Sequence, residues 1–128
     1  MTEDTKQIIV VRRDLKMRRG KECAQSGHAA IGFIEKRLDL NETKQSIKLT
    51  DAEISWFLNG TKKVTCQVDS LRELLDIAKK AKDAGVQCNI ITDSGHTEFH
   101  MEPTITCLAI GPDFDSKIDV ITGNLKLY

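Results

Sequence analysis

The sequence predicts a three-layer α/β/α domain with a mixed, mainly parallel sheet of about four strands. The first reason is that strand-like stretches alternate with helical patterns, as in domains whose crossover helices cover both faces of a sheet. The second is the short connection between the last two long strand-like stretches, which makes one strand antiparallel to its neighbour. The third is length, since 128 residues with 40% hydrophobic composition are enough for one core. We therefore expect residues 1–128 to form one domain.

The first half of the chain predicts one strand and two helices. Residues 7–11 hold four consecutive β-branched residues, a run typical of a strand that is buried on both faces. Residues 20–38 predict a helix from nearly helical spacing of apolar residues. Thr50 and Glu53 form a capping-box pattern, which opens a short helix that we expect to end at Gly60. The apolar side of the first helix is expected to contain Ala24, Ile31, Ile34 and Leu38.

The second half predicts three more strands and two more helices. Residues 63–68 alternate in polarity, which indicates a strand with one firmly buried face. Ser70 and Glu73 form a second capping-box pattern, and the helix that they open is expected to end at Gly85. Strands are expected at 86–92 and 104–110, and a last short helix at 115–121.

Charge and cysteine content argue against several classes of protein. The 19 basic and 19 acidic residues give a formal net charge of zero, which argues against broad, nonspecific coating of nucleic acid. No apolar run has the length of a membrane span, and the first residues carry no apolar signal segment, so we expect a cytoplasmic protein. The cysteines lack C-x-x-C spacing, which argues against a zinc knuckle or a redox pair, and without an export signal we expect them to be reduced thiols. We also expect no metal site, because no helical pattern surrounds the H-x-x-x-H pair of His96 and His100. The four cysteines are Cys23, Cys66, Cys88 and Cys107.

The zero net charge conceals one strongly basic segment, residues 12–21. This segment holds six cations and one acid, which gives a local charge of about +5. It follows the first predicted strand, and ligands of α/β sheets bind beyond such strand ends. A phosphate backbone is the partner that this charge favours, although a solvated surface explains the same composition. The six cations are Arg12, Arg13, Lys16, Arg18, Arg19 and Lys21.

A second strand end with reactive side chains lies at Asp93, after the strand at 86–92. Lys21, Gln25 and His28 are separated by four and three residues, so they project from one helix face. If the first and third strands are parallel neighbours, this face and Asp93 share one edge of the sheet. The plainer alternatives are that His28 is a packed histidine, that Gln25 is solvated, and that Asp93 only forms a turn.

Many of these residues occur in an order that is similar to one known family. The matching segments are Gln7 to Val11, Asp14-Leu15-Lys16-Met17, Gly20-Lys21, Ala24-Gln25, His28-Ala29, Asp93-x-Gly95-x-Thr97, Thr106 to Pro112, and Ile121-Thr122-Gly123-x-Leu125-Lys126-Leu127. They resemble the type II peptidyl-tRNA hydrolases over nearly the whole chain, so the resemblance is specific. It implies a compact α/β fold, often dimeric, that hydrolyses the ester between a peptide and the 3′-terminal adenosine of tRNA. It also implies that no metal or cofactor is needed.

The resemblance implies roles for individual residues as well. Positions that the family places at its active site match Lys21, Asp93, Thr97 and Thr106, and its neighbouring helix motif matches Gln25 and His28. We expect His28 or Asp93 to be the general base and Lys21 to stabilise the oxyanion or a nearby phosphate. Thr97 is the fourth expected catalytic residue. The expected substrate-binding residues are Gln25, Gly95, Thr106, Arg12, Arg13, Lys16, Arg18 and Arg19.

Three positions depart from the family pattern and keep other functions open. His96 stands where the family usually has arginine, Glu98 where it has glutamine, and Asn124 where it often has histidine. The first two favour an alternative, a catalytically silent RNA-binding or protein-interaction module on the same fold. A further alternative is an esterase or amidase for small substrates, in which the basic segment plays no part.

Overall fold

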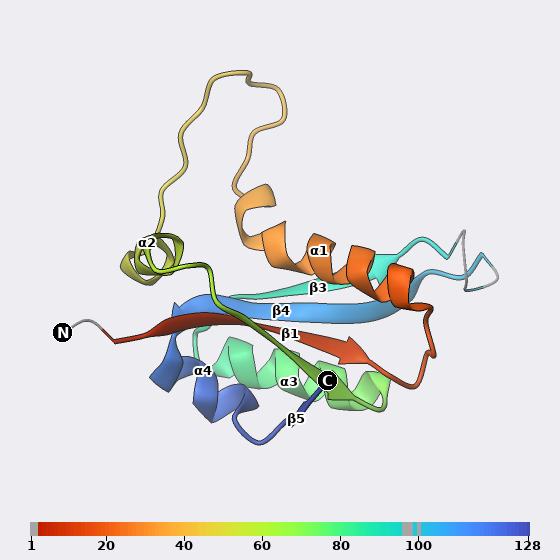
Figure 1. Ribbon diagram of the computed structural model, residues 1–128. Helices are drawn as coiled ribbons and strands as arrows, with labels where there is room; N and C mark the ends of the chain where they lie inside the picture. Colours follow the sequence, from red (N-terminus) through yellow and green to blue (C-terminus); the bar gives the residue numbers. More distant parts are fainter. Residues whose placement is uncertain (1–2, 96–98, 100) are drawn as a thin grey trace.

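The computed structural model describes residues 3–95, 99 and 101–128, and it contains one five-stranded sheet between two layers of helices (Figure 1). The predicted three-layer α/β/α class is therefore confirmed. Within the described residues, no helix combines the length and the apolar character that a membrane crossing requires. In chain order the elements are β1 (Thr5–Arg12), α1 (Arg19–Glu35), α2 (Asp51–Leu58), β2 (Lys63–Val68), α3 (Leu71–Asp83), β3 (Cys88–Asp93), β4 (Thr104–Phe114), α4 (Asp115–Thr122) and β5 (Lys126–Leu127).

The sheet has the strand order β3-β4-β1-β2-β5. β1 and β2 are parallel, whereas β4 runs antiparallel to both β1 and β3, and β5 runs antiparallel to β2. β1, β2 and β3 therefore point in one direction, which confirms a mixed sheet. β4 separates β1 from β3, so these two strands are not neighbours. Their C-terminal ends nevertheless lie at the same edge of the sheet. The fifth strand, β5, has two residues, too few for a sequence pattern to predict it.

The strand β1 lies at the centre of the structure, with both faces covered. Ile8 and Val10 belong to a core cluster with residues of α3 and α4 on one face. Ile9 and Val11 belong to a second cluster, with Ala29 of α1, on the other face. In Figure 1, α1 lies on one side of the sheet, with α3 and α4 on the opposite side. The run of β-branched residues therefore correctly predicted a strand buried on both faces.

The buried side of α1 differs from the predicted side. The side chains that face the sheet and α2 are Gln25, Ala29 and Phe33, whereas Ile31 is 53% exposed. Phe33 packs edge-on against Trp56 of α2, with 5.9 Å between ring centroids. The prediction failed because it counted only apolar residues, and Gln25 is buried with hydrogen-bonding partners on the sheet. The helix also ends at Glu35 rather than at Leu38.

A buried carboxylate joins α2 to the rest of the domain. The capping box predicted for this helix is present, because Thr50 and Glu53 exchange hydrogen bonds. Glu53 also accepts hydrogen bonds of 2.7 and 2.8 Å from Arg37, beyond the end of α1, and one of 2.6 Å from Gln87, before β3. Burial alone would raise the pKa of Glu53, but hydrogen bonds from Arg37, Thr50 and Gln87 hold that pKa below its usual value.

Candidate active site

Asp93 is the last residue of β3, and its carboxylate is held from two directions. Lys21 of α1 donates a 2.6 Å hydrogen bond to Oδ1, and the backbone N–H of Gly95 donates one of 2.8 Å to Oδ2. The second bond closes a turn in which Gly95 has a φ of 90°. A Cβ atom on Gly95 would lie 2.2 Å from the carbonyl oxygen of Glu102, so only glycine fits. Asp93 therefore forms the predicted turn and an ion pair as well.

The ion pair places a positive charge at an unfavourable position in α1. The helix begins at Arg19, so Lys21 lies in its first turn, where the helix dipole disfavours a cation. Asp93 offsets this penalty, and both side chains are largely buried, with 14% of Lys21 and 10% of Asp93 exposed. A partly buried charge pair at the carboxyl end of a strand is a common feature of binding and catalytic sites.

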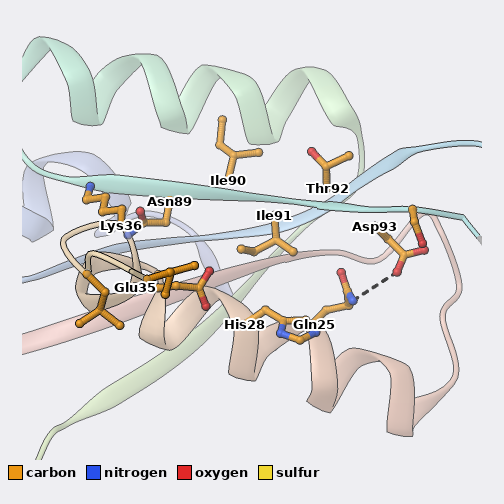
Figure 2. Close-up of a pocket in the computed structure, with 13 residues that line it drawn as sticks. Gln25, His28, Glu35, Lys36, Asn89, Ile90, Ile91, Thr92 and Asp93 are labelled. Carbon is orange, nitrogen blue, oxygen red and sulfur yellow. Dashed lines mark hydrogen bonds between the residues drawn. The ribbon is translucent and has the colours of Figure 1, made fainter. Parts of the chain in front are cut away.

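Gln25 extends the network from α1 to β4. The hydroxyl of Thr106 donates a 2.6 Å hydrogen bond to Oε1 of Gln25. This bond leaves the amide nitrogen of Gln25 facing Asp93, at the longer distance of 3.5 Å from Oδ1 (Figure 2). Gln25 is 4% exposed and Thr106 is fully buried, so Gln25 is not the solvated residue of the plainer alternative. Elements far apart in the sequence thus bring Lys21, Gln25, Asp93 and Thr106 together.

His28 lies on the same side of α1, one turn beyond Gln25. Its side chain is exposed, so it is not the packed histidine of the plainer alternative. Gln25 lies between His28 and Asp93 in Figure 2. All three residues line a groove of about 760 Å³ between α1 and β3. Thr97, the remaining predicted catalytic residue, lies outside the described residues, as do His96 and Glu98.

The basic segment contains cations in different environments. Arg12 donates to both carboxylate oxygens of Asp14 and, at 3.0 Å, to the carbonyl oxygen of Ile105. With 11% of its side chain exposed, Arg12 connects the end of β1 to β4. Lys21 is paired with Asp93, as described above. The exposed cations of this segment are Arg13, Lys16, Arg18 and Arg19.

An aromatic side chain that the sequence analysis missed lies beside the basic segment. The guanidinium carbon of Arg13 is 4.5 Å from the ring centroid of Tyr128, whose hydroxyl is hydrogen-bonded to Glu22. That hydrogen bond raises the pKa of Tyr128. Arg13, Tyr128, Arg19 and Cys23 line a second groove of about 680 Å³. No local pattern links Arg13 to Tyr128, because the pairing of β5 with β2 brings the end of the chain here.

Comparison with known proteins assigns the chain to a family. The family model described as peptidyl-tRNA hydrolase PTH2 matches residues 5–128. A peptidyl-tRNA hydrolase of Methanothermobacter thermautotrophicus is 48% identical over 122 residues, covering 95% of this chain and 98% of the relative. The corresponding protein of Methanocaldococcus jannaschii is 47% identical over 123 residues, with the same two coverages. That of Nanoarchaeum equitans is 48% identical over 124 residues, 96% of this chain and 98% of the relative. The chain therefore belongs to the PTH2 family of peptidyl-tRNA hydrolases.

Proposed function

We propose that the chain hydrolyses the ester that joins a peptide to the 3′-terminal adenosine of tRNA, at the site around Asp93. The observation that carries this proposal is the carboxylate of Asp93, oriented by Lys21, Gln25 and Gly95 at one end of an open groove. Membership of the PTH2 family supports the reaction, since the matched relatives are peptidyl-tRNA hydrolases. The reaction recycles tRNA after peptidyl-tRNA has dropped off the ribosome prematurely.

Ester hydrolysis requires an activated water and stabilisation of a developing oxyanion. Asp93 accepts a proton from the water, and the water oxygen attacks the carbonyl carbon of the ester. Lys21 supplies positive charge next to the tetrahedral oxyanion. The protonated Asp93 then returns this proton to the 3′ oxygen as the bond between that oxygen and the carbonyl carbon breaks, so the tRNA leaves with a 3′ hydroxyl and the peptide as a carboxylic acid. Gln25 and Thr106 act as positioning residues, because Thr106 orients the amide that faces Asp93.

His28 is the alternative general base, because its exposed ring lines the same groove. Removal of a positioned general base costs about 10²–10⁴ in rate. If Asp93 is the base, Asp93→Asn has this effect on kcat and His28→Gln lowers kcat less than tenfold. The reverse result would assign the base to His28.

Exposed cations of the basic segment are proposed to bind the phosphate backbone of the tRNA. Arg13, Lys16, Arg18 and Arg19 are exposed, and they follow β1 at the sheet edge where Asp93 ends β3. Arg12 takes part indirectly, because its guanidinium is bound to Asp14 and Ile105. Thr97 remains a predicted catalytic residue, with a proposed role in orienting water and substrate. A homodimer and a cytoplasmic location also belong to this proposal, and analytical ultracentrifugation tests the first of them.

Deacylation of two substrates tests the proposed function. The purified protein is incubated with N-acetyl-aminoacyl-tRNA, which resembles peptidyl-tRNA, and with free aminoacyl-tRNA. Cleavage of the blocked substrate and sparing of the free one are expected. Binding of tRNA without cleavage would instead support a silent RNA-binding module. Cleavage of small esters alone would support an esterase in which the basic segment has no role.

A further inference from the structure

The groove at the candidate active site continues well beyond it. It starts at Asp93 and Gln25 and runs between β3 and α1 to Leu38 and Leu40, which follow the helix. Figure 2 shows Ile91, with Asn89, on the side of β3 that faces α1, whereas Ile90 points to the opposite side. The reaction centre occupies only one end of this space.

The wall formed by β3 is an open sheet edge. β3 is the first strand in the sheet order, and within the described residues its one paired neighbour is β4. Gly111 donates to the carbonyl oxygen of Gln87 at 3.0 Å, and the register then pairs Asn89 with Ala109. Hydrogen-bonded and non-hydrogen-bonded pairs alternate in an antiparallel ladder. Asn89 is therefore hydrogen-bonded to β4, and Ile90, the next residue, directs its backbone N–H and C=O away from β4, towards the open edge.

We propose that the peptide part of peptidyl-tRNA binds in this groove as an extended strand, hydrogen-bonded to the open backbone of β3 at Ile90. This inference rests on the proposed function, since it places the ester at Asp93. β3 ends at Asp93, so a peptide whose C-terminal ester lies there runs parallel to β3, with its N-terminus towards Leu40. The six residues of β3 span about 17 Å at ~3.3 Å per residue, which accommodates about five residues of substrate.

The chemistry of the groove fits a peptide better than RNA. Its charged side chains include the acids Glu35 and Asp93 and the cation Lys36, so it offers no excess positive charge for phosphates. The exposed Arg13 and Arg19 instead line the second groove, beside Cys23 on α1. Pairing with a strand edge uses main-chain groups and tolerates any side chain. That mode of binding suits a substrate whose peptide differs from one molecule to the next.

An unsatisfied donor supports an occupant in the groove. Nδ2 of Asn89 is buried and has no hydrogen-bond partner among the described residues. Buried amide donors are nearly always paired in folded proteins, because an unpaired donor costs stability. Asn89 packs closely against Gly32 of α1, since a Cβ atom added to Gly32 would lie 3.0 Å from the side chain of Asn89. Rotation of its amide towards the groove would pair Nδ2 with a carbonyl oxygen of the bound peptide.

The length and the backbone of the substrate test this inference in the wild-type protein. N-acetylated alanine peptides of one to seven residues are attached to tRNA, and KM is measured for each. We expect KM to fall severalfold for each added backbone hydrogen bond, worth about 1 kcal/mol, and to level off near five residues. N-methylation of single amides in the five-residue substrate should raise KM at every second residue only. Equal KM values at all lengths, or no alternation, would overturn the inference. Failure to cleave even the one-residue substrate would instead overturn the proposed function.

A pair of substitutions at Ile90 provides the matched control. Ile90→Pro removes the outward N–H, and proline is tolerated at the open side of an edge strand. Ile90→Ala keeps that N–H and shortens a side chain that lies on the side of β3 opposite α1. Ile90→Pro should abolish most of the decrease in KM with peptide length, whereas Ile90→Ala should retain it. Thermal unfolding verifies that both variants are folded, and the N-methylation series decides the question if Ile90→Pro is not. The inference would also be overturned if the wild-type protein were a dimer that Ile90→Pro dissociates and if its KM did not depend on peptide length. Those two results would assign the edge of β3 to contact with a second copy of the chain.

Discussion

Replacing Thr106 with valine tests whether the buried contact between β4 and α1 orients Gln25 towards Asp93. Valine has nearly the shape of threonine, so the substitution removes the hydroxyl donor and leaves the packing intact. Oε1 of Gln25, 2.6 Å from that hydroxyl, then becomes a buried acceptor without its closest donor. An unsatisfied buried acceptor costs about 1–3 kcal/mol. For a chain of 128 residues, each kcal/mol lowers Tm by about 4 °C, so we expect Tm to fall by about 4–12 °C.

A double-mutant cycle with Gln25→Leu separates this contact from general damage to the core. Urea unfolding followed by fluorescence is a suitable assay, because the chain has a single tryptophan, Trp56, and it is buried. When both partners are apolar no polar group is left unpaired, so the double variant should be more stable than the two single effects predict, by about 1–2 kcal/mol. In the deacylation assay, Thr106→Val should lower kcat, and Thr106→Ser should restore most of it. Additive free energies of unfolding, or a kcat unaffected by Thr106→Val, would refute this account of Gln25.

Two further predictions concern the buried Glu53 and the basic segment. Glu53→Gln should destabilise the protein by about 2 kcal/mol at neutral pH, less than for a fully buried pair because Arg37 is partly exposed. Since the folded-state pKa of Glu53 is lowered from 4.5, its stabilisation is complete above that pH and is lost as pH falls through the lowered pKa. Urea unfolding should therefore show the variant and the wild type converging in acid, and a constant difference would contradict this. Arg19→Ala should reduce the slope of log affinity for tRNA against log salt concentration by about one, as expected for the loss of one phosphate contact. Filter binding measures this slope. Arg12→Ala should mainly lower Tm, and equal effects of the two substitutions on the slope would argue against their separate roles.

Local patterns in the sequence predicted the elements where one interaction dominates. The β-branched run around Ile9 requires burial on both faces, and β1 is the central strand. Thr50 and Glu53 satisfy backbone groups at the start of α2, as the capping-box pattern predicts. Ser70 likewise accepts from the backbone N–H of Glu73 at the start of α3. These interactions lie within a few residues of one another, so the sequence alone is sufficient to identify them.

Features that depend on pairing between distant residues were harder to predict. Helical spacing correctly placed Lys21 and Gln25 on one face of α1. It did not predict that Gln25 is buried, because the hydroxyl that donates a hydrogen bond to Gln25 belongs to Thr106 on β4, 81 residues away. The charge count of the basic segment correctly identified its sign, yet it treated Arg12 and Arg13 alike. One of them binds a carbonyl group of β4 and the other stacks on Tyr128. Their different surroundings follow from strand order, which no local pattern encodes.

The kinetics of Asp93→Asn with N-acetyl-aminoacyl-tRNA provide the strongest test of Asp93 as the general base. Asparagine keeps the size of the side chain and an acceptor for the N–H of Gly95, but it removes the charge that pairs with Lys21. Asp76→Asn, at an exposed acid on α3, is the matched control. We predict that kcat falls by about 10²–10⁴ in Asp93→Asn, with little change in KM, and remains at the wild-type value in Asp76→Asn. A folded Asp93→Asn protein with kcat within threefold of wild type would contradict the assignment of Asp93 as the general base.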